Sequence, residues 1–339
     1  MTDQPRPTSV LTIARGRAEH LRNVVQGLAR QTEAPRELVV GVMQDDLYDL
    51  PAAGFPVRQI RVAPDPDGAL PLAAARNAVA RAATGDVLAF LDVDCIPAPT
   101  FVADYARHAA EGAGLFMGEV LYLPGGVNAP GWRYDVFDRV AEKHSDRQGP
   151  PDGGPAPCED YRCFWSLNFA MHRADFALAG GFDERYRGYG GEDTDFGKTV
   201  AARGISLWWI RGAKVFHQYH PHAMPPVHHM DSVIANAERF REKWGYRTME
   251  HWLYAFELMG LLTKTGTWPE EEVHVLRQPT AIDEAMCRQE SHMPYANTTR
   301  VIRRLQEKRA GRPLRDDEAV PAMRAAQKTF LGAATVAAE

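Results

Sequence analysis

This chain has few cysteines, no long apolar run and no excess of positive charge. Its four cysteines, Cys95, Cys158, Cys163 and Cys287, match no zinc-binding spacing of the CxxC type. So few cysteines in 339 residues suit a reducing compartment. A bridge between Cys158 and Cys163 is the alternative in an oxidising setting, and we expect free thiols.

The sequence also lacks features of membrane and nucleic-acid-binding proteins. No stretch approaches the roughly 18 uncharged apolar residues that a spanning helix needs, so we expect no integral membrane segment. Residues 1–8 are polar and lack the apolar core of a signal peptide, which predicts a flexible N-terminus and a cytoplasmic protein. The formal net charge of −5 gives no global basic signal, so nucleic acid is not an expected partner.

Strands and helices alternate along the first part of the chain. We expect strands at residues 9–13, 37–43, 57–62 and 87–91, and helices at residues 19–31 and 72–83. This alternation is typical of βαβ units and predicts an α/β fold with a mainly parallel sheet. Farther on we expect helices at 97–110 and 193–202, strands at 116–123, 207–210 and 213–216, and an irregular loop at 145–160. From residue 231 the pattern is mostly helical, and the last thirty or so residues form either a helix or a tail.

Two carboxylates, Asp92 and Asp94, follow the apolar run at 87–91 directly. Open α/β sheets bind ligands at the carboxyl ends of their strands, so this pair lies where a ligand is expected. Burial of two uncompensated carboxylates is unfavourable, which predicts a divalent cation or strong hydrogen-bond donors beside them. Because Mg²⁺ and Mn²⁺ prefer oxygen ligands and phosphates, the pattern favours a metal site for a phosphorylated ligand. The alternative is that both aspartates cap the next helix at a turn.

A second acidic cluster, formed by Glu192, Asp193 and Asp195, follows a glycine pair at 190–191. It falls in the first turn of an expected helix, where the helix dipole alone stabilises acidic residues. Three acids within four residues exceed what capping needs. A carboxylate fixed at a helix start can take a proton from an incoming hydroxyl, so we expect a general base here.

Histidines gather after the strand expected at 213–216. They are His217, His220 and His222, with His228 and His229 nearby. Several imidazoles at a strand end are typical of a metal or phosphate site, although their irregular spacing does not predict a zinc centre. One imidazole that completes a site begun by Asp94 is the simplest interpretation, and polar residues with ordinary hydrogen bonds are the other.

Four segments in order resemble the family-2 glycosyltransferases of the GT-A fold, which use nucleotide-diphosphate sugars and invert the anomeric centre. They are Leu11-Thr12-Ile13-Ala14-Arg15-Gly16-Arg17, Ala75-Arg76-Asn77 through Asp92-Val93-Asp94, Gly180-Gly181-Phe182-Asp183-Glu184 through Gly191-Glu192-Asp193-Thr194-Asp195, and Val215-Phe216-His217. The third segment, with its Gly-Gly-Glu-Asp, is also similar to that of galactosyl- and N-acetylgalactosaminyl-transferring relatives. The resemblance implies a Rossmann-like sheet flanked by helices at 9–225, with a donor half at 9–123 and an acceptor half at 124–225. Residues 226–339 would then be a helical C-terminal region.

The resemblance also implies a metal and a donor. The metal, Mn²⁺ or Mg²⁺, is expected on Asp94 and His217, with Asp92 and His220 as further ligand candidates. The donor is a nucleotide-diphosphate sugar, with a UDP-sugar favoured. Its expected contacts are Ala14, Arg15, Asp45, Asp46, Arg76, Asp92 and Val93. Many relatives have Tyr-Asn or Phe-Asn where this chain has Ala14-Arg15, so the nucleobase contacts are the less secure part.

Catalysis and acceptor binding are assigned in the same way. Asp193 would be the base, Glu192 would hold acceptor hydroxyls, and Trp165 would stack on a sugar face or else be a core residue. The acceptor is a hydroxyl compound of unknown class, and a homo-oligomer is one option for the assembly. Two alternatives remain: a non-catalytic protein that binds nucleotide sugars or glycans, and a haloacid-dehalogenase-like phosphatase. The phosphatase motif normally lies near the start of a chain, whereas about ninety residues precede Asp92 here.

Overall fold

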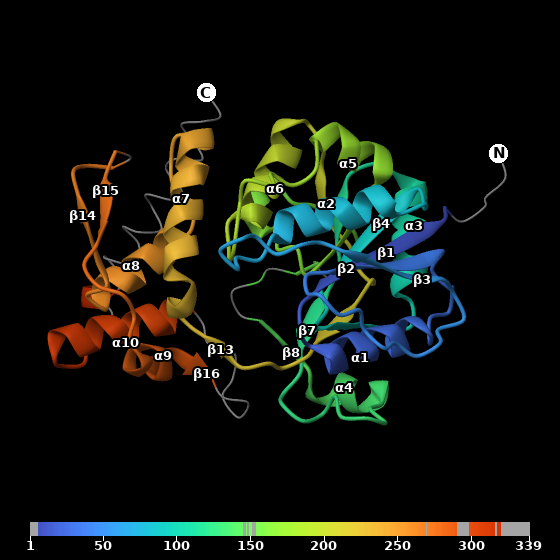
Figure 1. The fold of residues 1–339 in the computed structure, drawn as a ribbon, viewed down its shortest axis with the longest axis horizontal. Helices are drawn as coiled ribbons and strands as arrows, with labels where there is room; N and C mark the ends of the chain where they lie inside the picture. The colour runs from blue at the N-terminus through green and yellow to red at the C-terminus, as the bar shows by residue number, and fades with distance from the viewer. Residues whose placement is uncertain are drawn as a thin grey trace. The chain divides into compact units, whose positions relative to one another are not determined.

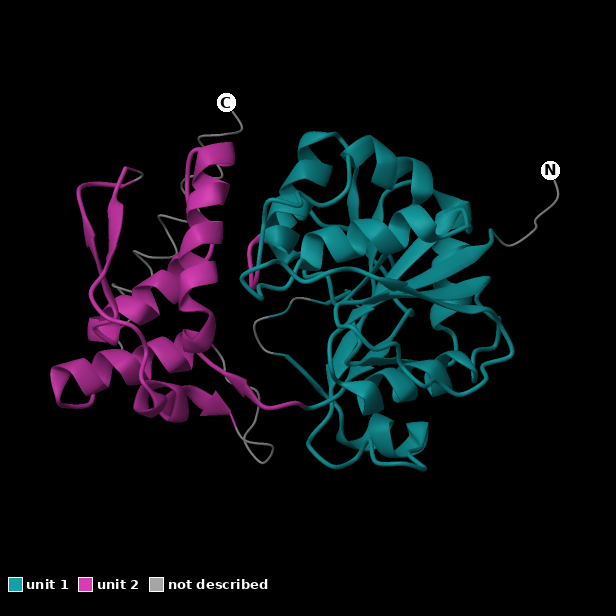
Figure 2. Cartoon of the chain, viewed as in Figure 1, with its two compact units in different colours: residues 1–187, 192–219 teal, residues 188–191, 220–339 magenta. Residues whose placement is uncertain are grey.

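The chain forms two compact units (Figure 2). The computed structural model describes residues 6–144, 147, 149–150, 154–268, 270–289, 298–315 and 317–319. The first unit comprises residues 1–187 and 192–219, and the second comprises residues 188–191 and 220–339. The expected domain boundary at residue 225 stays a prediction. Most of the expected flexible N-terminus and most of the last thirty residues lie outside the described residues.

An eight-stranded sheet forms the centre of the first unit (Figure 1). Its order is β3-β2-β1-β4-β10-β6-β11-β9. The strands are β1 (Thr8–Ala14), β2 (Glu37–Val42), β3 (Val57–Arg61), β4 (Val87–Leu91), β6 (Leu115–Met117), β9 (Ala156–Pro157), β10 (Asn168–His172) and β11 (Leu207–Trp209). Strands β3, β2, β1 and β4 are parallel, as the βαβ pattern predicts. The sheet is mixed beyond them, because β10 runs antiparallel to β4 and β6, and β9 runs antiparallel to β11.

Helices cover both faces of this sheet. Helices α2 (Leu72–Ala82), α5 (Arg173–Ala179) and α6 (Glu192–Ala202) share one apolar core with it, and α1 (Ala18–Leu28) lies on the opposite face (Figure 1). Every residue of β1 and of β4 is buried, as in strands that are covered on both sides. The unit also contains α3 (Phe101–Glu111), α4 (Tyr134–Val140) and the 3-10 turn η1 (Tyr161–Cys163). The expected α/β class is confirmed.

A smaller, four-stranded sheet lies in the same unit. It is formed by β5 (Cys95–Pro97), β12 (Val215–His217), β7 (Val120–Tyr122) and β8 (Glu142–Lys143), in that order. It corrects two expectations. Residues 95–97 pair with β12, so the helix expected from residue 97 begins only at Phe101. The strand expected at 116–123 divides into β6 and β7, which lie in different sheets, whereas the strands expected at 207–210 and 213–216 are present as β11 and β12.

Close packing explains where the first of these strands breaks. A Cβ atom at Gly118 would lie 2.5 Å from the carbonyl oxygen of Ala213 and 2.6 Å from Nδ2 of Asn168. Only glycine therefore fits where the chain passes from one sheet to the other. The loop expected at 145–160 also needs correction, because β9 pairs there with β11. These pairings join distant parts of the sequence, so local composition does not show them.

The second unit is mostly helical, as expected. It contains α7 (Met230–Trp244), α8 (Glu250–Leu258), α9 (Ala281–Cys287), α10 (Thr298–Ala310), the 3-10 turn η2 (Val227–His229) and the strand pairs β14 (Leu262–Thr265) with β15 (Glu272–Val275) and β13 (His222–Ala223) with β16 (Arg288–Gln289). It has an apolar core of its own, with members on α7, α8 and β14. None of the described helices is long and apolar enough to cross a membrane. All four cysteines are free thiols.

Residues 188–191 interrupt the first unit in sequence and belong to the second. The Asn236 side chain donates a hydrogen bond to the carbonyl oxygen of Gly190 at 2.8 Å. The rings of Tyr189 and His229 are stacked, with centroids 4.8 Å apart. This short segment leads directly into Glu192, the first residue of α6. Contacts from α7 and η2 therefore hold the peptide that precedes that helix.

The Asn168 side chain connects the two sheets and yields a stability prediction. It donates hydrogen bonds to the carbonyl oxygens of Ala213 at 2.7 Å and Glu119 at 3.2 Å, and it accepts one from the Tyr105 hydroxyl at 2.6 Å. Asn168→Ala leaves these buried groups without their partner, so we expect the free energy of unfolding to fall by about 2–4 kcal/mol. Urea titration measures the change. Asn128→Ala, at a half-buried site, is the control with an expected loss below about 1 kcal/mol; equal losses would contradict this role.

Candidate active site

The carboxyl ends of three parallel strands meet at one edge of the large sheet. Strands β2, β1 and β4 are neighbours there, so the residues that follow them share this edge. The turn after β1 is tied to the loop after β2, because the Gly16 amide donates a hydrogen bond to Oε1 of Gln44 at 2.7 Å. Gly16 and Arg17 both have positive φ, of 60° and 50°, and thereby reverse the chain before α1. This edge is where open α/β sheets bind ligands.

The Asp94 carboxylate is buried at this edge, with 5% of the residue exposed. One of its oxygens is paired with the Arg17 guanidinium, and the other lies 3.5 Å from Nε2 of His217. The small sheet explains the second contact: β5 begins at Cys95, and Cys95 is opposite His217 in the antiparallel pair of β5 and β12. Backbone pairing thus places a histidine beside an aspartate that is more than a hundred residues away in sequence.

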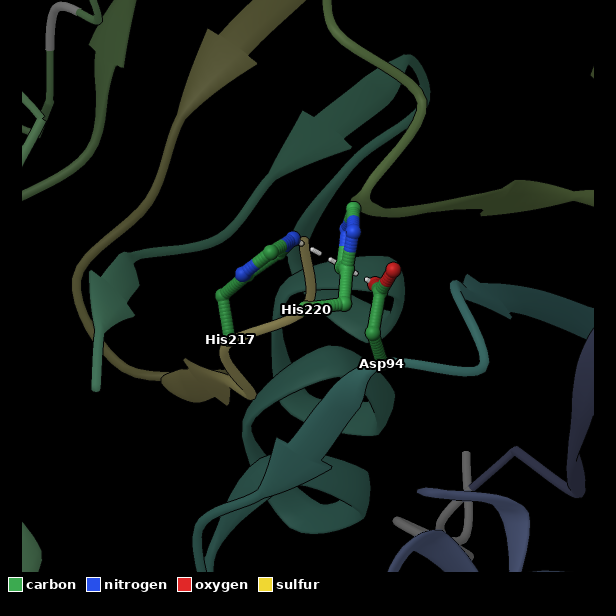
Figure 3. A group of neighbouring side chains, drawn as sticks. All are labelled: Asp94, His217 and His220. Carbon is green, nitrogen blue, oxygen red and sulfur yellow. Dashed lines mark ion pairs between the residues drawn. The ribbon is translucent and has the colours of Figure 1, made fainter. Parts of the chain in front are cut away.

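A group of three side chains suited to a metal ion includes these two residues. His220 follows His217 by three positions, and the ligand atoms of Asp94, His217 and His220 all lie within 4.8 Å of one another (Figure 3). One carboxylate oxygen and two imidazole nitrogens fit Mn²⁺, whereas Mg²⁺ prefers oxygen ligands throughout. Asp92 is not a member of this group in the described part of the chain.

Asp92 instead contacts a buried arginine. Arg76, on α2, is 6% exposed, and its guanidinium lies 3.4 Å from Oδ1 of Asp92 and 3.1 Å from Oε1 of Glu192. The same guanidinium lies over the ring of Phe182. Burial and the neighbouring Asp94 carboxylate raise the pKa of Asp92 to about 6, against the lowering effect of Arg76. The Arg76 guanidinium thus connects Asp92, which follows β4, with Glu192, which begins α6.

Asp193 is the half-buried member of the second acidic cluster. Its Oδ1 accepts a hydrogen bond from the Thr194 amide at 2.7 Å. Burial, together with the neighbouring Glu192 carboxylate, raises the pKa of Asp193 to about 7. A carboxylate whose pKa lies near neutrality has the proton affinity that a general base needs. Asp195 is fully buried and accepts a hydrogen bond from the Tyr186 hydroxyl at 3.3 Å, so its position is structural.

The remaining expected site residues are placed as follows. Ala14 is buried at the end of β1, and Val93 is buried between the two aspartates. Asp45 and Asp46 are exposed after β2. Arg15 is exposed and reaches the carbonyl oxygen of Gly68 at 3.5 Å, whereas Trp165 is half-buried against the ring of His144, with centroids 5.5 Å apart. No ligand defines their roles, which stay predictions.

Sequence reasoning missed Arg17, the counter-charge of Asp94. Arg15 was expected as a donor contact and no arginine was expected beside Asp94, but the turn at Gly16 and Arg17 directs Arg17 to this aspartate. The sequence held a signal, since Arg15 and Arg17 flank a glycine directly after the first strand. Which arginine reaches Asp94 depends on backbone angles that the sequence does not reveal. His222, His228 and His229 also lie outside the described metal group.

Comparison with known proteins agrees with this geometry. Residues 9–173 match the model of glycosyl transferase family 2, and residues 156–221 match that of the N-terminal domain of galactosyltransferase. Validoxylamine A glucosyltransferase from Streptomyces hygroscopicus subsp. limoneus is 29% identical over 287 residues, 74% of this chain and 58% of that protein. Its counterpart from Streptomyces hygroscopicus subsp. jinggangensis (strain 5008) is 28% identical over 306 residues, 79% of this chain and 67% of that protein. The chain thus spans 58% of the length of the first relative.

A solved structure shares the fold. The crystal structure of GalNAc-T7 with UDP, GalNAc and Mn²⁺ superposes with a TM-score of 0.52 at 15% identity, over 92% of this chain and 56% of that one. At this identity the superposition shows a shared fold, which is the GT-A fold expected from the sequence. The two family matches and the two relatives agree with the resemblance to family-2 glycosyltransferases that is drawn from the sequence motifs.

The raised pKa of Asp193 predicts that this residue lowers stability at neutral pH. Between about pH 4 and pH 7 the carboxyl group is ionised in the unfolded chain but still holds its proton in the folded one, so the folded state loses stability as pH rises. We expect Asp193→Asn to raise the free energy of unfolding by ~1–2 kcal/mol at pH 8 and by less at pH 5. Urea titrations at both pH values test this. The control is Asp195→Asn, which weakens the contact with Tyr186 and should not raise the free energy of unfolding. A rise in the free energy of unfolding of Asp193→Asn that is the same at both pH values would contradict the assignment.

Proposed function

We propose that this protein transfers a hexosyl group from a nucleotide-diphosphate sugar, preferably a UDP-sugar, to an acceptor hydroxyl. The observation that carries the proposal is the position of Arg76 between Asp92 and Glu192. Through this contact the strand-end acids, where a donor would bind, and the acids that begin α6, where a base is expected, share one site. A protein that only binds sugar nucleotides has no need of a half-buried base beside its donor site.

The donor would occupy the edge formed by the ends of β1, β2 and β4. The nucleoside would lie against the segments that contain Ala14, Arg15, Asp45 and Asp46, which line the first two strand ends. Asp92 and Val93 would contact the ribose side, and Arg76 would hold Asp92 in place. The buried guanidinium also adds positive potential near the expected pyrophosphate.

A cation would be held by Asp94, His217 and His220, whose donor atoms favour Mn²⁺ over Mg²⁺. Such an ion offsets the negative charge that develops on a departing diphosphate. Arg17 pairs with Asp94 and keeps that buried carboxylate compensated without the ion. Arg17 and the cation would therefore be rival counter-charges of the same carboxylate, with Arg17 at one oxygen and His217 beside the other.

Asp193 would be the general base that acts on the acceptor. Its carboxylate would remove the proton from the attacking hydroxyl, and the oxygen would displace the diphosphate from the opposite face of the anomeric carbon. This single displacement inverts the anomeric centre and needs no covalent intermediate on the protein. Glu192, fixed by Arg76, and the exposed part of Trp165 would orient the acceptor sugar or alcohol. The relatives' name makes UDP-glucose the first donor to test.

Replacement of the base tests the proposed reaction directly. We expect Asp193→Asn to reduce transfer from UDP-glucose by at least ~100-fold, because the amide cannot accept the hydroxyl proton. Affinity for UDP with Mn²⁺, measured by calorimetry, should stay within about twofold of the original value, since Asp193 would not touch the nucleotide. Near-normal transfer by this variant would rule out Asp193 as the base. Absence of transfer by the unaltered protein across a panel of sugar nucleotides, with UDP still bound, would favour the binding-protein alternative.

Metal binding can be tested without any turnover. We expect His217→Ala to weaken Mn²⁺ binding, followed by electron paramagnetic resonance of the free ion, by at least ~10-fold. Arg17→Ala should strengthen it by about tenfold, because the competing cation is removed from Asp94. His228→Ala is the matched control, since His228 is exposed and lies outside the ligand group. Equal Mn²⁺ affinity in all four proteins would refute the site.

A further inference from the structure

Exposed apolar side chains are concentrated in one short part of the second unit. Eight large apolar residues are exposed in the described chain, and four of them fall between residues 275 and 286. They are Val275 at 45%, Leu276 at 61%, Ile282 at 72% and Met286 at 48% exposed. Single exposed apolar residues are common on protein surfaces, but a local concentration indicates an interaction site.

Helix α9 presents two of these residues on one face. Ile282 and Met286 are four positions apart and therefore lie on the same side of the helix. Asp283 and Cys287, one position farther along in each case, are buried and face the unit's interior. Asp283 is held there by Arg277 and by the cap residue Thr280. The outward position of Ile282 and Met286 is thus fixed by an anchored inner face.

Helix α10 adds a row of positive charge beside this face. Arg300, Arg304 and Lys308 recur every four residues and are all exposed. Arg304 and Arg309 form no ion pair or hydrogen bond with any residue that the structure describes, whereas the single acid of the helix is paired with Arg303. Their charge is therefore available to an external partner.

The apolar face and the basic row form one continuous surface. The Lys308 ammonium group contacts the Met286 thioether, which joins α10 to α9. Figure 1 shows the two helices side by side within the second unit. We call Ile282, Met286, Arg300, Arg304 and Lys308 the α9–α10 surface.

We infer that the α9–α10 surface docks on a lipid bilayer that contains anionic headgroups. Protruding Ile and Met side chains gain stability only where they leave water, as they do between lipid headgroups. Long basic side chains beside them can reach anionic phosphates while their own methylene groups stay in the apolar zone. Nucleic acid would satisfy the positive charges but would leave Ile282 and Met286 in water, so lipid is the better match. Such docking would hold the transferase at a membrane surface without a spanning helix.

Sedimentation of the full chain with vesicles tests this surface. We expect binding to phosphatidylcholine vesicles that contain about 30 mol% phosphatidylglycerol, and much weaker binding to pure phosphatidylcholine. Arg304→Glu/Lys308→Glu and, separately, Ile282→Ser/Met286→Ser should each weaken binding by at least ~10-fold. The control is Arg36→Glu/Arg203→Glu, which reverses two exposed charges in the first unit and should leave binding unchanged. Melting temperatures confirm that each variant is folded.

Two results would overturn the inference. One is an absence of binding to anionic vesicles at low salt, or binding that the control weakens as much as the α10 variant does. The other is binding to an oligonucleotide that is as tight as binding to the vesicles, or tighter, and that the Ile282→Ser/Met286→Ser variant retains. That result would assign the surface to nucleic acid. Loss of vesicle binding in both α9–α10 variants, with the control unaffected, would support it.

Discussion

A buried guanidinium and three carboxylates around it form the interaction on which the site depends. Without Arg76, the negative charges of the half-buried Asp92 and the buried Glu192 would lack the counter-charge that the guanidinium supplies. Arg76 holds both acids in place. It also lowers the pKa of the adjoining Asp193, whereas the Glu192 carboxylate raises that pKa. Arg76 on α2 thus opposes the rise that burial causes in the pKa values of Asp92 and Asp193.

The second constraint is the pairing of two three-residue strands. β5 and β12 contribute Ile96 and Phe216 to an apolar core that they share with Phe137 of α4, and their register fixes the separation of Asp94 and His217. β5 is an edge strand and pairs only with β12, so this one pairing sets the position of the residues that adjoin it. The Asp-x-Asp turn therefore has two directions of support. Asp92 is held from α2, and Asp94 is held from the small sheet and from the turn at Arg17.

The sequence revealed the parts of this arrangement that rest on local signals. The apolar run before Asp92, the helix that begins at Glu192 and the alternation up to β4 all depend on neighbouring residues, and the structure has them. The division at Gly118, the strand at 95–97 and the antiparallel entry of β10 depend on partners far along the chain, so periodicity could not show them. Arg17 was missed for a similar reason, since its direction is set by two positive φ angles. The resemblance named Asp94 together with His217, and the structure brings these two side chains together, while their roles stay predictions.

The hydrogen bond from Asn236 to Gly190 has a consequence for the order in which the protein folds during synthesis. Gly190, in the peptide that leads into α6, emerges from the ribosome 46 residues before Asn236, whose side chain binds it. A nascent chain can thus pair β1 to β4 early, as segments that are close in sequence, while the start of α6 lacks this hydrogen bond until α7 follows. The peptide that precedes α6 is therefore secured by a residue made after strands β1 to β4 are finished.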